Sequence, residues 1–265
     1  MRFLEKKVIW ITGASSGIGE ALVYEAVKKG ATVIASSNCK KELYEVKEKC
    51  GELKHRVDIA CFDLGDTENI ADLVGQQIKE FGRIDYLVNL GGISQRARVD
   101  ETPMSIDRKI MEINYFGTIA LSKAVLPYMI KQQSGHILAT SSISGRFGFP
   151  LRSAYSASKQ AIHGFIETLH LENKQNNVRA SVIIPGRVRT NISKHALLAD
   201  GSEQGTMDPG LDKGITPQKA ALTIIRGIRK NRREIKVGGT ELIMLYIRKY
   251  FPSIFFNIAS RIKTR

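Results

Sequence analysis

Near its N-terminus the chain reads VIWITGASSGIG over residues 8–19, an apolar run followed by a glycine-rich turn. Gly13, Gly17 and Gly19 lead into a segment with helical periodicity, so the order is strand, turn, helix. A helix N-terminus offers unpaired N–H groups and a positive dipole end to a pyrophosphate. The segment therefore predicts a dinucleotide site. The alternative is a turn needed only for close packing, because the G-x-x-x-G-x-G spacing differs from the more familiar G-x-G-x-x-G.

Seven apolar segments have the length and composition of strands. They are residues 8–11, 32–35, 59–62, 84–89, 136–140, 179–184 and 234–237. Helical patterns lie between most of them, at residues 20–29, 40–49, 67–80, 104–130, 154–175 and 216–230. This alternation predicts an α/β fold, a doubly wound Rossmann-type parallel sheet with helices on both faces. Ligands bind such sheets beyond the carboxyl ends of the strands, so we expect functional residues directly after strands.

The composition of the 265 residues, 43% hydrophobic and 25% charged, is that of a globular protein with a sizeable core. We assign residues 1–239 to one Rossmann-type dinucleotide-binding and catalytic domain and residues 240–265 to a C-terminal extension. Cys39, Cys50 and Cys61 lack the spacing of metal ligands, so we expect no metal site and a reducing compartment. The residues before the first strand leave no room for a signal peptide, which predicts an intracellular, cytoplasmic location.

The formal net charge of +14 raises the question of nucleic-acid binding, because a clustered basic surface is what phosphate binding requires. Residues 226–265 carry 11 basic and 2 acidic residues, so the excess is concentrated at the C-terminus. No zinc-finger, helix-turn-helix or RNA-binding signature accompanies it. We therefore expect no specific nucleic-acid partner.

Tyr155 and Lys159 lie four residues apart near the start of a helical pattern, so they share one helix face. A neighbouring ammonium favours the phenolate and lowers the phenol's pKa from about 10 toward the range useful for proton transfer. The same spacing occurs at Tyr24 and Lys28. The spacing alone therefore does not identify a site.

Together with further positions at strand ends, these features resemble the short-chain dehydrogenase/reductase family, in its shorter single-domain branch, over nearly the whole chain. The matching positions are residues 12–19, Asp63-Leu64, Asn89-Leu90-Gly91-Gly92, Asn114, Ser141-Ser142, Tyr155 with Lys159, and Pro185-Gly186 with Thr190. One motif departs from the family, which usually has Asn-Asn-Ala-Gly at residues 89–92. The contacts of the second asparagine are lost there, although the glycines still allow close approach of a cofactor.

The resemblance implies an NAD(P)-dependent oxidoreductase that interconverts a carbonyl and an alcohol on a small or lipophilic substrate. It implies that Tyr155 is the general acid or base and that Lys159 lowers its pKa and binds the nicotinamide ribose. Ser142 would hydrogen-bond the substrate oxygen, and Asn114 would hold a water in the proton relay. The alternatives are a strand-end cap for Ser142 and a buried helix amide for Asn114. A catalytically silent protein that senses cofactor or binds a membrane surface is the alternative function.

The resemblance also implies a cofactor site along the carboxyl ends of the strands. Its residues are Gly13, Ser15, Ser16, Gly17, Ile18, Gly19, Ser37, Asn38, Lys41, Asp63, Leu64, Asn89, Gly91, Tyr155, Lys159, Pro185, Gly186, Val188 and Thr190, the last with a turn cap as its alternative. Ser37 stands where NAD-binding members usually carry the acid that binds the ribose hydroxyls, so repulsion of a 2′-phosphate is absent. We therefore expect NADP(H) to be favoured over NAD(H), with the phosphate held by Ser37, Asn38 and Lys40 or Lys41.

Residues 191–215 contain several glycines and have mixed polarity, and they lie where this family places its mobile substrate loop. His195, Leu197 and Leu198 are candidates for lining a pocket there, with simple exposure as the alternative for the histidine. The sequence of this loop does not identify a substrate. Members of this family are commonly dimers or tetramers, so the resemblance implies a homodimer or homotetramer.

Residues 241–258 are strongly apolar and aromatic, but Arg248, Lys249 and Pro252 interrupt them, so a membrane-spanning helix is not expected. With Arg261, Lys263 and Arg265, the extension suits peripheral contact with an anionic membrane. Together with residues 91–96 it resembles a membrane-associated branch of the family that acts on lipophilic carbonyls or alcohols. The alternative is that the extension packs on its own domain or on another subunit.

Overall fold

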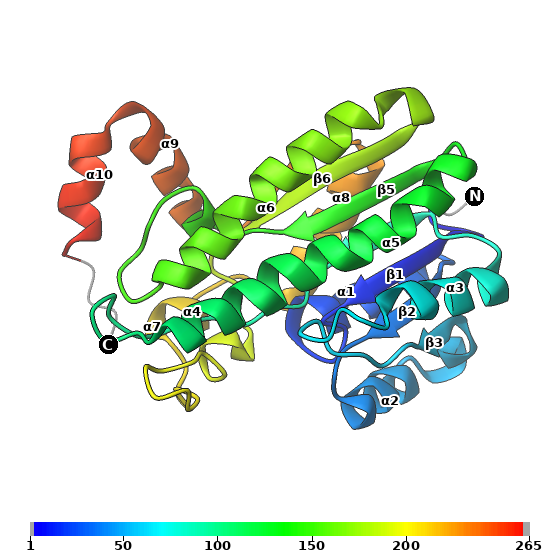
Figure 1. Cartoon of the computed structure of the whole chain (residues 1–265), viewed down its shortest axis with the longest axis horizontal. Coiled ribbons are helices and arrows are strands. Elements are labelled where there is room, and N and C mark those ends of the chain that lie inside the picture. Colours follow the sequence, from blue (N-terminus) through cyan, green and yellow to red (C-terminus); the bar gives the residue numbers. More distant parts are fainter. Residues whose placement is uncertain (1–2, 262–265) are drawn as a thin grey trace.

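The computed structural model describes residues 3–261, in which seven parallel strands form one sheet in the order β3-β2-β1-β4-β5-β6-β7 (Figure 1). The strands are β1 (Val8–Thr12), β2 (Thr32–Ser36), β3 (Val57–Ile59), β4 (Tyr86–Asn89), β5 (Gly135–Thr140), β6 (Val178–Pro185) and β7 (Glu234–Val237). The strand order reverses where β1 pairs with β4. A doubly wound sheet opens a crevice at this point, beyond the carboxyl ends of the strands.

Helices cover both faces of the sheet (Figure 1). One face carries α1 (Gly17–Lys28), α2 (Lys40–Lys49) and α8 (Pro217–Arg229), and the other carries α3 (Ile70–Phe81), α5 (Gly117–Lys131) and α6 (Ser153–Glu172). Alternate residues of β1 pack into two different hydrophobic cores, one on each face of the sheet. Ile9 and Ile11 pack on the α1 side, whereas Val8 and Trp10 pack on the α5 side. The doubly wound fold predicted from the alternating patterns is confirmed.

The third strand begins and ends earlier than its apolar pattern predicts, at Val57–Ile59 instead of residues 59–62. The following residues still run beside β2. Ala60 N–H donates to the carbonyl of Ala35 (3.1 Å), and Phe62 N–H donates to that of Ser37 (3.1 Å). This continued proximity to the sheet explains why residues 59–62 have the composition of a strand.

The long helix predicted over residues 104–130 is divided into α4 (Met104–Met111), a π-helical turn (Glu112–Phe116) and α5. A π turn inserts one extra residue without breaking the apolar stripe, so periodicity alone does not reveal it. The wider turn contains Asn114, whose side chain is fully buried. Such turns occur frequently at functional sites, and this one lies next to the segment that follows β4.

The C-terminal residues form two short helices, α9 (Ile243–Tyr250) and α10 (Pro252–Ala259), which stand to one side of the sheet (Figure 1). Pro252 occupies the first turn of α10, where its missing N–H costs nothing. Phe255 is 1% exposed, and its ring centroid lies 4.6 Å from that of Phe147. Within residues 3–261, no helix is long and apolar enough to cross a membrane. Lys263 and Arg265 lie outside the described residues.

Candidate functional site

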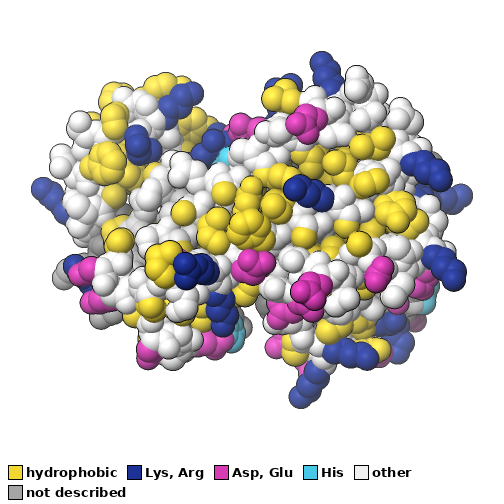
Figure 2. Space-filling view, viewed as in Figure 1, with side chains coloured by type: hydrophobic (Ala, Val, Ile, Leu, Met, Phe, Trp, Pro, Cys, Tyr) yellow, Lys and Arg dark blue, Asp and Glu magenta, His cyan; other side chains and the backbone are white. Residues whose placement is uncertain are grey.

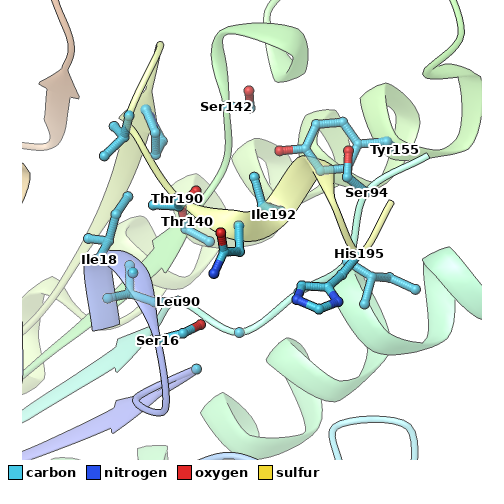
Figure 3. Close-up of a pocket in the computed structure, with 18 of the residues that line it drawn as sticks. Ser16, Ile18, Leu90, Ser94, Thr140, Ser142, Tyr155, Thr190, Ile192 and His195 are labelled. Atoms are coloured by element: carbon cyan, nitrogen blue, oxygen red, sulfur yellow. The ribbon is translucent and has the colours of Figure 1, made fainter. Parts of the chain in front are cut away.

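A cavity of about 810 Å³ opens at the carboxyl ends of the strands (Figure 3). Most of the predicted site residues line it: Gly13, Ser15, Ser16, Gly17, Ile18, Gly19, Ser37, Asn38, Asp63, Leu64, Gly91, Ser142, Tyr155, Lys159, Pro185, Gly186, Val188 and Thr190. Three do not, namely Lys41, Asn89 and Asn114. The described residues contain no group of three or more His, Cys, Asp or Glu side chains arranged to hold a metal ion.

The glycine turn at one end of the cavity is pressed against two neighbouring segments. Gly13 has a φ of +63°, and a Cβ there would lie 2.8 Å from the Cα of Gly91. Gly17 has a φ of +57°, and its Cβ would lie 2.9 Å from a methyl carbon of Thr190. Beyond these contacts, the first turn of α1 lines the cavity with N–H groups that lack intrahelical acceptors. These features fit the pyrophosphate of a dinucleotide.

Thr12 and Asn89 support the segment after β4 that forms the cavity wall next to the glycine turn. The hydroxyl of Thr12 accepts hydrogen bonds from the N–H groups of Leu90 and Gly91, both at 3.1 Å. The side-chain amide of Asn89 is buried and donates to the hydroxyl of Ser122 (3.2 Å) and to a carbonyl of β5 (3.3 Å). Asn89 therefore supports the cavity wall without reaching its surface.

Tyr155 lies in the first turn of α6 and directs its hydroxyl into the cavity, with Ser142 on the same side (Figure 3). Burial raises the pKa of the Tyr155 phenol, and the Ser142 side chain opposes this rise by hydrogen bonding. The positive charges that also oppose it belong to Arg96 and Arg152. Ser142 additionally caps a short helical turn by accepting from Ser144 N–H at 3.2 Å, so its capping alternative describes part of what it does.

Lys159 is 2% exposed, and its ammonium lies 5.9 Å from the centre of the Tyr155 ring. The ammonium donates to the carbonyl of Thr140 at 3.1 Å. Burial lowers the pKa of Lys159 to about 8. A lysine whose charge is disfavoured in this way gains from any additional acceptor that enters the cavity.

The second Tyr-x-x-x-Lys pair has a different environment. The hydroxyl of Tyr24 donates to the carboxylate of Glu20 at 2.7 Å on α1. Burial and this carboxylate both raise the pKa of Tyr24, so its proton is held more tightly. The structure therefore distinguishes two pairs that share one spacing.

Asn114 connects the π-helical turn to the wall of the cavity. Its Oδ1 accepts from Ile93 N–H (2.8 Å), and its Nδ2 donates to Ile93 O (3.0 Å) and to the hydroxyl of Ser158 (3.0 Å). These contacts correspond to the buried-amide alternative for the side chain. A role of this residue in a proton relay stays a prediction.

The end of β2 and the residues after β3 meet beside the glycine turn, where Ala14 N–H donates to the carbonyl of Ser36 (3.0 Å). Ser37 accepts from Cys39 N–H at 3.1 Å, and the amide of Asn38 donates to Asp63 at 3.4 Å. The charged residue of α2 that lines the cavity is Glu42, not Lys41. Lys40 and Lys41, which were expected to bind the 2′-phosphate, therefore do not line the cavity.

The substrate loop, residues 191–215, forms the remaining wall. His195 lines the cavity and pairs with Glu203 at 2.9 Å, whereas Leu197 packs with Ile106 and Ile110, and Leu198 is not part of the wall. Sequence reasoning missed three charged residues that line this side: Arg96, Arg152 and Asp208. Arg96 and Asp208 lie in segments that the sequence singles out, residues 91–96 and the substrate loop, but nothing in the sequence pairs these charges with each other or with Arg152.

Comparisons with known proteins agree with this geometry. The family model for short chain dehydrogenase matches residues 7–200. The chain is 38% identical over 270 residues to "Dehydrogenase/reductase SDR family member 7B" of Xenopus tropicalis, covering 98% of this chain and 87% of that protein. It is also 38% identical to "Dehydrogenase/reductase SDR family protein 7-like" of Drosophila melanogaster, covering 97% and 81%.

Solved structures show the same architecture. A short-chain dehydrogenase from Streptomyces avermitilis is 29% identical, with a TM-score of 0.81 over 96% of this chain and 95% of that one. A short-chain dehydrogenase/reductase from Burkholderia phymatum, solved with NAD, shares the fold with a TM-score of 0.84 over 96% of each chain at 20% identity. The matched profile, the relatives and the shared fold together establish that this chain belongs to the short-chain dehydrogenase/reductase family of oxidoreductases.

Proposed function

We propose that this oxidoreductase uses a nicotinamide cofactor to interconvert a carbonyl and an alcohol, with Tyr155 exchanging the proton. The observation that carries the proposal is the juxtaposition of Tyr155, Ser142 and Lys159 in the same cavity that the glycine turn before α1 lines. When bound, the nicotinamide supplies or accepts the hydride. The protein supplies orientation and a proton.

In the direction of reduction, the Tyr155 hydroxyl donates its proton to the substrate oxygen, where negative charge develops. Ser142 lies beside that hydroxyl, and its O–H can turn from the phenol to donate to the same oxygen, since the N–H of Ser144 occupies only an acceptor position of its Oγ. Among residues 3–261, the ammonium of Lys159 donates to one acceptor, the carbonyl of Thr140, so it has N–H groups left for a ribose and for the phenol. Asn114 is a positioning residue in this scheme, since it holds Ile93 and Ser158 in place.

The matched pair Tyr155→Phe and Tyr24→Phe tests this assignment. Each variant removes one phenol hydroxyl from a Tyr-x-x-x-Lys pair, but only Tyr155 lines the cavity. We expect Tyr155→Phe to lower turnover of added carbonyls with NADPH by a factor of about 10² or more, while nucleotide binding, followed by nicotinamide fluorescence, is kept. Tyr24→Phe should retain turnover. Equal activity in the two variants would refute the role of Tyr155, and nucleotide binding without turnover in the unmodified chain would favour the silent, cofactor-sensing alternative.

We further propose that NADPH is preferred to NADH. The neutral side chains of Ser37 and Asn38 stand at the end of β2, where a carboxylate would repel a 2′-phosphate. Glu42 and Asp63 lie in the same wall, so the preference rests on Ser37 and Asn38 and not on an excess of positive charge. Titration with both nucleotides tests it. Ser37→Asp should weaken NADPH binding by at least about tenfold relative to NADH, with Ser37→Asn as the uncharged control, and tighter NADH binding by the unmodified chain would contradict the preference.

We also propose that the 240–265 extension contacts membranes that contain anionic lipid, which would suit a lipophilic substrate. On α9 and α10, large apolar side chains lie beside Arg248 and Lys249, and Figure 2 shows apolar and basic side chains interspersed on this lobe. The exposed apolar residues are Ile243, Tyr246, Tyr250, Phe251, Ile254, Phe256 and Ile258. Such a surface suits a headgroup boundary. The extension also packs on its own domain through Phe255, so the packing alternative holds for its inner side.

Co-sedimentation with vesicles tests the membrane proposal. We expect binding to vesicles that contain phosphatidylserine, weak binding to neutral vesicles, and loss of binding in the double variant Ile254→Ser/Phe256→Ser. Leu171→Ser is the matched control, because Leu171 is an exposed apolar residue of α6 outside the extension. Equal loss of binding in the control, or none in the double variant, would contradict a specific role of the extension.

We propose, finally, that the protein forms a homodimer or homotetramer. Phe116, at the end of the π-helical turn, is a large apolar side chain that is 44% exposed. A second copy would remove this ring and its neighbours from water, and symmetric association is the usual form for soluble oligomers. Light scattering after size-exclusion chromatography should show a dimer or tetramer that Phe116→Arg dissociates. A monomeric unmodified chain would rule this out.

A further inference from the structure

Three charged residues from separate segments meet at the substrate side of the cavity. Arg96 follows β4, Arg152 precedes α6, and Asp208 precedes α7 (Pro209–Asp212) within the substrate loop. Arg96 donates to Asp208 from Nε (3.1 Å) and from Nη2 (2.6 Å), and Arg152 donates to the same carboxylate oxygen at 3.0 Å. One carboxylate of the loop therefore bridges two guanidinium groups of the body of the domain.

The three side chains are largely withdrawn from water, with exposed fractions of 4% for Arg96, 14% for Arg152 and 13% for Asp208. Burying charges is costly unless further hydrogen bonds compensate. Here Arg96 also donates to Ser94 (2.8 Å), and Asp208 also accepts from Gln204 (3.0 Å). Such a cluster is strongly sensitive to the loss of one partner, because the remaining charges stay buried without compensation.

The cluster holds residues 206–214, which lie between two stretches of strand-like pairing. Residues 203–205 pair back onto residues 194–197, and Ile215 pairs with the segment 187–189. The earlier part of the loop runs beside residues 94–96, where Arg96 N–H donates to Leu197 O (2.8 Å) and Leu197 N–H donates to Ser94 O (2.9 Å). Beyond Leu197, Asp208 provides the ion pairs that join the loop to the segments carrying Arg96 and Arg152. Opening this part of the wall requires that both ion pairs break, together with the hydrogen bond that Asp208 N–H donates to the hydroxyl of Ser193 (3.1 Å).

We propose that Asp208 is a latch that closes residues 206–214 over the substrate end of the cavity, and that the balance of charge in this latch sets the pH range in which Tyr155 exchanges its proton. Asp208, Arg96 and Arg152 are thus positioning residues. The second half of the proposal rests on the proposed role of Tyr155, whereas the first half does not.

The charges around Tyr155 give the direction of the second effect. Lys159 lies on its own helix, Arg152 and Arg96 lie at the cavity wall, and the loop contributes Asp208 and the His195–Glu203 pair. Neutralising Asp208 leaves two cations uncompensated, which favours the phenolate of Tyr155. Removing Arg152 leaves only Arg96 to balance Asp208, and this loss of a positive charge disfavours the phenolate of Tyr155. The two substitutions therefore shift the proton transfer in opposite directions.

Limited trypsin proteolysis of the nucleotide-free protein tests the latch without any reliance on activity. Lys213 is an exposed cleavage site in the latched segment. We expect Asp208→Asn to accelerate cleavage there by about tenfold or more, since cleavage follows the population of the open state. Asp200→Asn is the matched control, because it makes the same chemical change at an exposed carboxylate of the same loop, away from the cleavage site. Cleavage of Asp208→Asn at the rate of the control would overturn the latch.

The pH dependence of turnover tests the effect on Tyr155. In a plot of turnover against pH, Asp208→Asn should move the limb that reports the ionisation of Tyr155 to lower pH. Arg152→Gln should move the same limb to higher pH, and each shift should be about one pH unit. Shifts in the same direction, or none, would overturn this half of the proposal. Arg152→Gln leaves the Arg96–Asp208 pair intact and serves if Asp208→Asn does not fold. If the unmodified chain shows no turnover, the proposed function fails while the proteolysis still decides whether the latch exists.

Discussion

Replacing Lys159 by methionine is expected to make the protein more stable and at the same time inactive. Lys159 is almost completely buried, and burial lowers its pKa from 10.5 to about 8. Since one pKa unit corresponds to about 1.4 kcal/mol, the buried ammonium destabilises the folded state by about 3 kcal/mol at neutral pH. Methionine has a similar length and no charge. The lost hydrogen bond to Thr140 offsets about 1 kcal/mol of the gain, which leaves about 2 kcal/mol.

The pH dependence of this gain follows from the direction of the pKa change. Between pH 8 and pH 10.5 the unfolded chain holds more protons on Lys159 than the folded chain, so the wild type gains stability as the pH rises. The advantage of Lys159→Met is therefore full below about pH 8 and disappears above about pH 10.5.

Thermal and urea unfolding of the nucleotide-free protein at pH 7, 8.5 and 10.5 measures this difference. At pH 7 we expect Lys159→Met to raise Tm by roughly 4–8 °C, from about 2 kcal/mol in a chain of this size. Lys79→Met, at an exposed position of α3, is the control and should change stability by less than about 0.5 kcal/mol at each pH. A Lys159→Met variant that is no more stable than wild type at pH 7, or whose advantage persists at pH 10.5, would refute this reasoning.

Three further predictions concern the rest of the fold. Gly19→Ala places a Cβ on the carbonyl oxygen of Gly13, so we expect loss of nucleotide binding and a lower Tm, measured by titration and thermal unfolding. Phe255→Ala removes a ring packed on Phe147, and we expect faster hydrogen exchange in α9 and α10 while the sheet is unchanged; exchange that stays slow would contradict this packing role. Burial lowers the pKa of His136 to about 3, so the unfolded chain binds an extra proton below about pH 6.5. His136→Asn should therefore flatten the loss of stability between pH 6 and pH 4 in unfolding titrations.

The features that the sequence revealed are those with a strong local signature. The strand-turn-helix order at residues 8–19 predicted the glycine turn, and the alternation of patterns predicted the sheet. The π-helical turn that contains Asn114 has no such signature, since the apolar residues on either side keep a helical spacing. The predicted third strand extended past the observed end of β3, because residues 60–62 remain hydrogen-bonded beside β2 without forming part of the strand.

The residues that escaped prediction are defined by contacts between distant segments. Arg96, Arg152 and Asp208 are far apart in the sequence, and only folding brings their charges together. Lys41 and Glu42 are adjacent, yet only the glutamate lines the cavity, because successive residues of a helix point about 100° apart. Sequence spacing gave the pairing of Tyr155 with Lys159, but burial, which dominates the pKa of both, is a property of the folded chain.

The contact between Leu64 and Gly91 has a consequence for how this site can change over time. A Cβ at Gly91, where the family usually has alanine, would lie 2.5 Å from a methyl carbon of Leu64. The side chains at positions 64 and 91 therefore compete for the same space. A larger side chain at one position requires a smaller or differently oriented side chain at the other. A lineage that moves between the two motifs has a preferred order of substitution, with the residue at 64 reduced before alanine enters at 91. Transplanting the common motif into this chain without its distant counterpart would create an incompatibility that neither residue shows alone.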